Sequence, residues 1–89
     1  MITITLSGYP EALLGRPSIT APFPSGAVLA DAVTAVAAQD VRLGTALLHS
    51  DARPRQSTKV LLNGAVTSLD TRIPADAQVT VLAALPCDG

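Results

Sequence analysis

The sequence is poor in aromatic residues, cysteine and histidine. Only Tyr9 and Phe23 are aromatic, and there is no tryptophan. With so few rings to stack on bases, and with six basic residues set against seven acidic ones, the chain has little of what nucleic-acid binding requires. One cysteine and one histidine cannot build an internal disulfide, a zinc site or a four-cysteine iron–sulfur cluster.

Long apolar runs and a basic leader are also missing. No segment approaches the run of about 18 apolar residues that a membrane-spanning helix needs. The start of the chain, Met1–Leu6, lacks the basic region and the long apolar stretch of a signal peptide. We therefore expect a cytoplasmic protein that does not bind membranes. The composition is 48% hydrophobic and mainly aliphatic, which is enough for the core of one small domain.

Hydrophobic periodicity predicts strands on both sides of one helix. Leu29, Val33 and Val36 recur at helical spacing in an alanine-rich segment, so we expect an amphipathic helix over residues 25–39. Alternating or β-branched runs predict strands at residues 2–6, 18–23, 59–62 and 79–82. The order β-β-α-β-β predicts an α+β fold, a mixed sheet packed on one main helix.

Turn and loop signals leave parts of this picture open. Asn63-Gly64 is a strong two-residue hairpin signal directly after the third strand. Residues 11–17 are predicted as a loop or short turn, and residues 43–48 as either a helical turn or a brief strand. One helix covers only one face of a sheet. The other face therefore either exposes an apolar patch for a partner or is covered by residues 8–17 and 43–58.

The sequence contains no recognisable set of catalytic residues. It has no glycine-rich phosphate loop, and its acidic residues are scattered singly. His49 stands beside Ser50 and Asp51 without a spacing that assembles nucleophile, base and orienting group, so we expect it to be a loop residue. We predict that the chain is not an enzyme.

The C-terminal segment follows the last predicted strand and ends in glycine. We expect residues 1–82 to form the folded domain and residues 83–89 to form a flexible tail. Seven extended residues reach roughly 23 Å at about 3.3 Å each. The free α-carboxyl group of Gly89 is ionised at neutral pH, because such groups titrate in the acid range. The tail is either a frayed end or the functional part of the molecule.

Four short motifs occur along the chain in a characteristic order. They are Leu47-Leu48-x-x-Asp51-x-Arg53-x-Arg55, Lys59-Val60-Leu61-Leu62-Asn63-Gly64, Leu69-Asp70-Thr71-x-Ile73, and Asp76-x-x-Val79-x-Val81-Leu82. In order, spacing and distance to the C-terminus they resemble the ThiS/MoaD sulfur-carrier family. The resemblance covers nearly the whole chain and implies the β-grasp, or ubiquitin-like, fold.

The resemblance also implies a function for the tail. In such carriers the terminal glycine carboxylate attacks the α-phosphate of ATP in a partner adenylyltransferase. The acyl-adenylate accepts sulfur to become a thiocarboxylate, which the carrier delivers to a biosynthetic enzyme for a cofactor or natural product. Carried over to this chain, Gly89 would hold the sulfur, and Pro86, Cys87 and Asp88 would thread into the partner. The ATP belongs to the partner, and the chain itself binds no cofactor.

The ending of this chain departs from the family pattern. The family ends in two glycines, whereas this chain ends in Asp88-Gly89. At roughly 6 Å from a phosphate charge and an effective dielectric constant of about 20, the Asp88 carboxylate would be repelled by about 3 kcal/mol unless the partner supplies a cation. The alternative function is therefore a ubiquitin-like interaction module that has lost the carrier tail. Cys87 either accepts a persulfide, joins a partner by a disulfide, or is an incidental exposed cysteine.

The sheet supplies the expected partner-docking surface. We place it on the strand face that contains Val60, Leu62, Val79 or Val81. Both β-strand runs are apolar at consecutive positions, so the sequence leaves open which set of alternating side chains faces outward.

Overall fold

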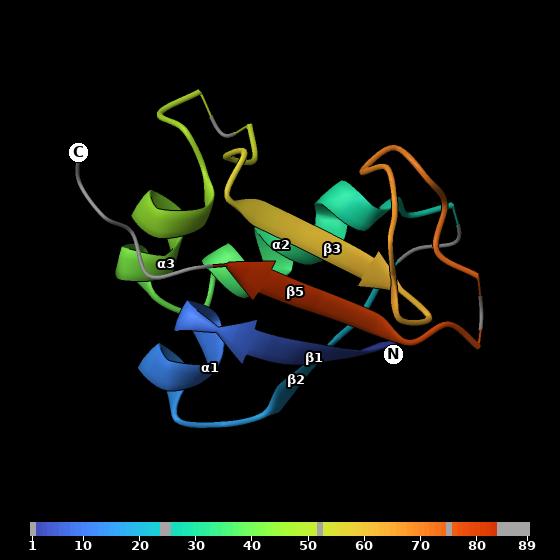
Figure 1. The fold of residues 1–89 in the computed structure, drawn as a ribbon, viewed down its shortest axis with the longest axis horizontal. Helices are drawn as coiled ribbons and strands as arrows, with labels where there is room; N and C mark the ends of the chain where they lie inside the picture. The colour runs from blue at the N-terminus through green and yellow to red at the C-terminus, as the bar shows by residue number, and fades with distance from the viewer. Residues whose placement is uncertain (1, 24–25, 52, 75, 84–89) are drawn as a thin grey trace.

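The computed structural model describes residues 2–23, 26–51, 53–74 and 76–83, and shows a mixed five-stranded sheet with helices packed behind it (Figure 1). The elements in chain order are β1 (Ile2–Gly8), α1 (Tyr9–Leu14), β2 (Ser18–Ala21), α2 (Leu29–Ala37), α3 (Val41–Leu47), β3 (Thr58–Leu62), β4 (Ala65–Val66) and β5 (Val79–Ala83). The strand order is β2-β1-β5-β3-β4. β1 runs parallel to β5, and the other pairs are antiparallel. The predicted α+β fold class is confirmed.

The core lies between the sheet and α2 and α3. The alternation of β1 turns Ile4 and Leu6 toward these helices, where both side chains are buried. The helical spacing of Leu29, Val33 and Val36 gives α2 a fully buried apolar face against them. Burial of each such side chain stabilises the fold by about 1.5–3 kcal/mol, so this contact holds the sheet and α2 together.

The N-terminal end of α2 is stabilised by a loop rather than by a polar side chain before it. The helix begins at Leu29, four residues later than predicted. The first two amide groups of the helix donate to carbonyl groups of the 69–71 loop: Leu29 N to Thr71 O at 2.9 Å and Ala30 N to Leu69 O at 2.9 Å. These bonds satisfy donors that an isolated helix leaves open. The sequence pattern does not reveal this distant partner segment.

Two segments that the sequence left undecided are helices. Residues 9–14 form α1, whose second residue, Pro10, has its φ angle already fixed near the helical value. Tyr9, Leu13 and Leu14 of α1 pack against the core. Residues 41–47 form α3, which buries Leu43 and Leu47 in that same core. The described residues thus contain three helices, not the single helix that was predicted: α2 and α3 pack against each other, and α1 contacts β1 and β5.

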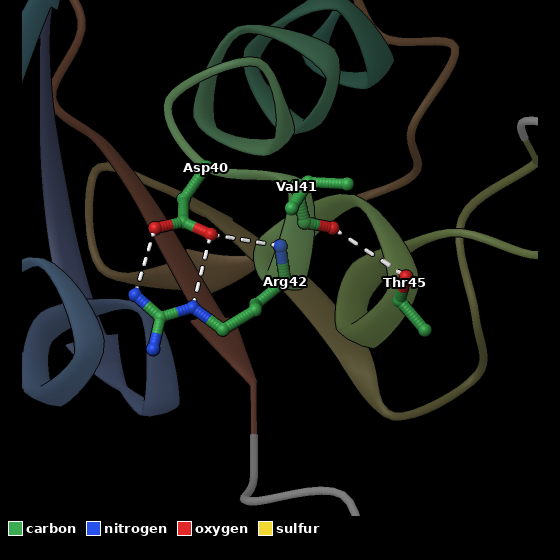
Figure 2. Close-up of polar contacts among 4 residues, drawn as sticks. All are labelled: Asp40, Val41, Arg42 and Thr45. Carbon is green, nitrogen blue, oxygen red and sulfur yellow. Dashed lines mark hydrogen bonds and ion pairs between the residues drawn. The ribbon is translucent and has the colours of Figure 1, made fainter.

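The N-terminus of α3 is capped by Asp40 (Figure 2). The Asp40 carboxylate accepts a hydrogen bond from the backbone amide of Arg42 at 2.8 Å. It also accepts from the Arg42 guanidinium, through Nε at 3.1 Å and Nη2 at 2.9 Å. The side-chain bonds from Arg42, followed by the backbone bond, hold the pKa of Asp40 below its usual value. This cap explains why a short segment containing Gly44 and Thr45 forms a helix.

The cap predicts a pH-dependent contribution to stability. Because the folded-state pKa of Asp40 is depressed, its contribution is present above the ordinary aspartate pKa and is lost as the pH falls through the folded-state value. We expect Asp40→Asn to lower the free energy of unfolding at neutral pH, and the deficit to shrink below about pH 4. Urea titrations of both chains across this range check it. A deficit that stays constant with pH would contradict the role of the charge.

The turn between β3 and β4 was predicted correctly. Asn63 and Gly64 both have positive φ angles, 53° and 87°, as the two central residues of a type I′ hairpin turn require. The Asn63 side chain accepts from the Gln78 amide at 2.9 Å, and its backbone amide donates to Gln78 O at 2.8 Å. The turn thus also fixes the start of β5.

Candidate functional site

The C-terminal segment leaves the described structure from a central strand of the sheet. β5 lies between β1 and β3, and its last residue, Ala83, pairs with Gly8 on one side and Thr58 on the other. Ala83 is only 1% exposed. The base of the segment is therefore fixed on both sides. Pro86, Cys87, Asp88 and Gly89, the residues predicted to carry the chemistry, lie outside the described residues.

Gly8 permits the close approach of β1 to this base. Its φ angle is 72°, which side chains of L-residues rarely tolerate. A Cβ atom built on Gly8 would lie 2.3 Å from the carbonyl oxygen of Ala83. Glycine is therefore required here both by backbone conformation and by space. The sequence pattern does not single out Gly8, since its contact with β5 depends on the parallel pairing.

Replacement of Gly8 should destabilise the base of the segment. For Gly8→Ala we expect a loss of about 2 kcal/mol in the free energy of unfolding, from the unfavourable φ angle together with the backbone clash. Gly15→Ala is the matched control: Gly15 has a φ angle of 68°, but nothing lies within 4 Å of its added Cβ. It should cost about 1 kcal/mol. Chemical denaturation measures both, and equal losses would contradict the close contact.

Thr58 connects the base of the segment to α3. It is the buried polar residue among those described, with 4% exposure. Its hydroxyl group donates to the carbonyl oxygen of Leu47 at 3.0 Å, and its backbone amide donates to Arg55 O at 3.0 Å. Since Thr58 also pairs with Ala83, the end of β5, the end of α3 and the loop before β3 form one fixed unit.

The predicted docking residues lie on the wrong side of the sheet. Val60, Val79 and Val81 face the helices and are 1%, 0% and 0% exposed. Leu62 has the same orientation in β3 and packs against the core at partial exposure. These side chains hold the fold together, because the helices occupy the space that a partner would need. A partner that docks on the sheet meets the alternate residues instead.

The alternate residues form a surface that we call the open face, the side of the sheet away from α2 and α3 (Figure 1). The strand registers place Leu82 between Ser7 and Lys59, and Leu61 between Thr80 and Val66. Leu61 and Leu82 are partly exposed, and Val66 is 68% exposed. Leu61, Val66 and Leu82, the open-face patch, are thus three apolar side chains with hydroxyl groups and one lysine beside them.

The exposure of the open-face patch shows whether residues 8–17 and 43–58 cover the second face of the sheet. Residues 8–17 and 43–58 were one possible cover for its second face. They contribute α1 and α3, whose apolar residues join the core on the helix side. The second face therefore keeps its apolar patch. Such exposed apolar groups with a polar rim are typical of protein-interaction surfaces.

The described residues contain neither a cluster of metal-ligating side chains nor a membrane-spanning helix. No three histidine, cysteine, aspartate or glutamate residues in the described ranges are grouped so that they could hold a metal ion. Over the same part of the chain, no helix has the length and apolar character to cross a membrane. His49 is exposed beside α3.

The arrangement of strands and helices defines the class of fold, and comparison with known proteins identifies it as β-grasp. SAMP1 from Haloferax volcanii superposes with a TM-score of 0.81 over 99% of this chain and 97% of its own, at 18% identity. A Pyrococcus furiosus protein described as subunit 1 of a molybdopterin converting factor gives 0.72, over 94% and 97%, at 16% identity. A chain of the BexX/CysO complex from Amycolatopsis orientalis gives 0.67, over 99% and 100%, at 16% identity.

These structural neighbours confirm the predicted ubiquitin-like fold. At such low identity the likeness establishes the fold and not the function. No family model and no curated protein sequence match the chain.

Proposed function

We propose that the protein is a sulfur carrier whose C-terminal Gly89 is activated by a partner adenylyltransferase and then carries sulfur as a thiocarboxylate. The observation that supports this most strongly is the position of the open-face patch relative to the base of the C-terminal segment. Leu82 belongs to the patch and directly precedes Ala83, the last described residue. A partner docked on the patch is thus next to the start of the segment that it has to bind.

The fold comparison gives independent support for a protein partner. One structural neighbour comes from a complex of CysO with a second protein, BexX. A β-grasp domain of this size can therefore work together with another protein. For this chain we propose two partners in the cytoplasm: an adenylyltransferase that supplies and uses ATP, and a biosynthetic enzyme that accepts the sulfur.

The test is the intact mass of the chain after incubation with ATP, a sulfur source and candidate adenylyltransferases. We expect a gain equal to the exchange of one oxygen for one sulfur. A persulfide on Cys87 would instead add a whole sulfur atom, so the mass separates the two sites. An unchanged mass with every adenylyltransferase tested would contradict the carrier function.

A second function rests on one feature of the sequence. Asp88 stands where the resembling family has a glycine, and it adds a side chain and a charge. This favours a ubiquitin-like interaction module that binds through the open face and forms no thiocarboxylate. Binding to a partner without any change in mass is its distinguishing result.

Both functions predict that the open-face patch binds the partner. Leu61→Asp places a charge among Val66 and Thr80, and we expect it to weaken partner binding about tenfold or more, because a charge must then be desolvated in the interface. Thr34→Asp, at an exposed position of α2 in the helix layer, is the control and should bind normally. Calorimetric titration measures both. Equal affinities for the two variants would exclude the open face.

A further inference from the structure

A second surface lies on the helix side of the molecule. It is a shallow groove of about 470 Å³ beside α3, which we call the α3 groove. Its apolar part is formed by Ala37, Val41 and Leu48, and its polar part includes His49 and Arg55. Val41 is 84% exposed, the largest exposure among the exposed large hydrophobic side chains. Such a valine at the edge of a groove is an unused apolar contact.

Arg55 is held in this groove in a fixed position. Its Nε atom donates to the carbonyl oxygens of Thr45 and Leu48, at 2.9 and 3.1 Å, at the end of α3. Its backbone amide donates to Leu47 O at 2.8 Å. The hydrogen bonds that the side chain makes to described residues use only Nε, so its two terminal amino groups have no partner in this part of the chain.

The electrostatics of the groove favour an anionic ligand. Among the described residues, no aspartate or glutamate lines it. Two acids adjoin lining residues in sequence, and both are already paired: Asp40 with Arg42 at 2.9 Å and Asp51 with Arg53 at 2.7 Å. Arg55 takes part in neither of the two ion pairs among the described residues. A guanidinium group with free donors is well suited to a carboxylate.

The chain's own C-terminal segment starts close to this groove. Ala83 pairs with Thr58, and the Thr58 amide donates to Arg55 O. In Figure 1, the C-terminal end of β5 and helix α3 lie at the same end of the sheet. Residues 84–89 add up to about 20 Å when extended, at about 3.3 Å per residue. Their sequence begins with Ala84-Leu85-Pro86, which is apolar, and ends with the carboxylates of Asp88 and Gly89.

We propose that in the free protein the α3 groove binds the C-terminal segment, residues 84–89. Leu85 and Pro86 cover the apolar side chains of Val41 and Leu48, and the carboxylates at the end pair with the Arg55 guanidinium. This contact goes beyond the carrier function and does not depend on it. It gives Asp88 a role within the chain.

The single cysteine allows a direct test on the complete chain. A nitroxide label on Cys87 broadens the amide signals of residues near it in NMR spectra. We expect broadening at Gly44, Thr45 and His49, relative to a diamagnetic label. Val41→Glu, which adds a negative charge to the exposed edge of the groove, should remove most of it. Val66→Glu, at the exposed valine of the open face, should not, and about 1 M salt should weaken it by screening.

A second measurement avoids the bulk of the label. In the unlabelled chain, Asp88→Asn should shift the amide signals of the groove residues, because one of the two carboxylates is neutralised. Broadening and shifts confined to residues beside Ala83 would overturn the proposal. So would broadening that appears only between differently labelled chains, since it would place the segment in a second copy. Neither experiment uses ATP or a partner, so failure here is distinct from failure of the carrier function.

Discussion

Deletion of Gly89 is expected to abolish sulfur loading and to leave the stability of the fold unchanged. The described core is formed by residues up to Ala83, and we expect the fold to persist without the terminal residue. Removal of one residue withdraws the terminal carboxylate by about 3.3 Å from the phosphate that it has to attack. A misplacement of about 1 Å already costs on the order of a hundredfold in rate. The new end, Asp88, also brings a side chain to the reacting position.

The experiment combines intact mass with urea denaturation of the same preparations. A chain that carries one additional glycine is the matched control for reach, because it keeps a side-chain-free end but moves the carboxylate outward. Both length variants should unfold like the parent chain and fail to gain sulfur. Normal loading of the shortened chain would show that the terminal glycine is not the reacting residue.

Asp88→Gly is expected to raise the efficiency of adenylation by about a hundredfold. The estimate is the repulsion between a carboxylate and a phosphate charge at roughly 6 Å, about 3 kcal/mol at an effective dielectric constant of about 20. Pyrophosphate release at limiting carrier concentration measures it. Asp88→Asn separates the charge from the size of the side chain and should recover most of the gain.

Asp76→Asn is the control for net charge. Asp76 is exposed in the loop before β5, so its neutralisation changes the total charge equally but leaves the segment intact. It should have no effect on adenylation. A loss of activity in Asp88→Gly would contradict the repulsion and would indicate a partner whose arginine or lysine recognises the acid.

The sequence predicted the parts of the fold in which a single periodic pattern decides the structure. The alternation of Ile2, Ile4 and Leu6 predicted β1, and the helical spacing of Leu29, Val33 and Val36 predicted α2. It missed α1, because six residues give too little periodicity; the available signal was Pro10, since proline is favourable at the start of a helix. For residues 43–48 the sequence left helix and strand open; the signal that favours the helix is Asp40, a good N-cap residue before an apolar segment.

The candidate site was harder to predict, because it depends on strand pairing. In β3 the residues Val60, Leu61 and Leu62 are all apolar, so alternation does not show which ones face the helices. The register between β3 and β5 decides this and places Leu61 and Leu82 on the open face. The contacts of Gly8 with Ala83 and of Thr58 with Leu47 likewise join segments that are distant in sequence.

Fragmentation of the loaded chain in a mass spectrometer shows whether the terminal carboxylate carries the sulfur. After incubation with ATP, a sulfur source and the adenylyltransferase, the C-terminal fragments locate any added sulfur. We expect one oxygen of the Gly89 carboxyl group to be replaced by sulfur and Cys87 to be unmodified. Sulfur found on Cys87, with an unchanged carboxyl group at Gly89, would contradict it.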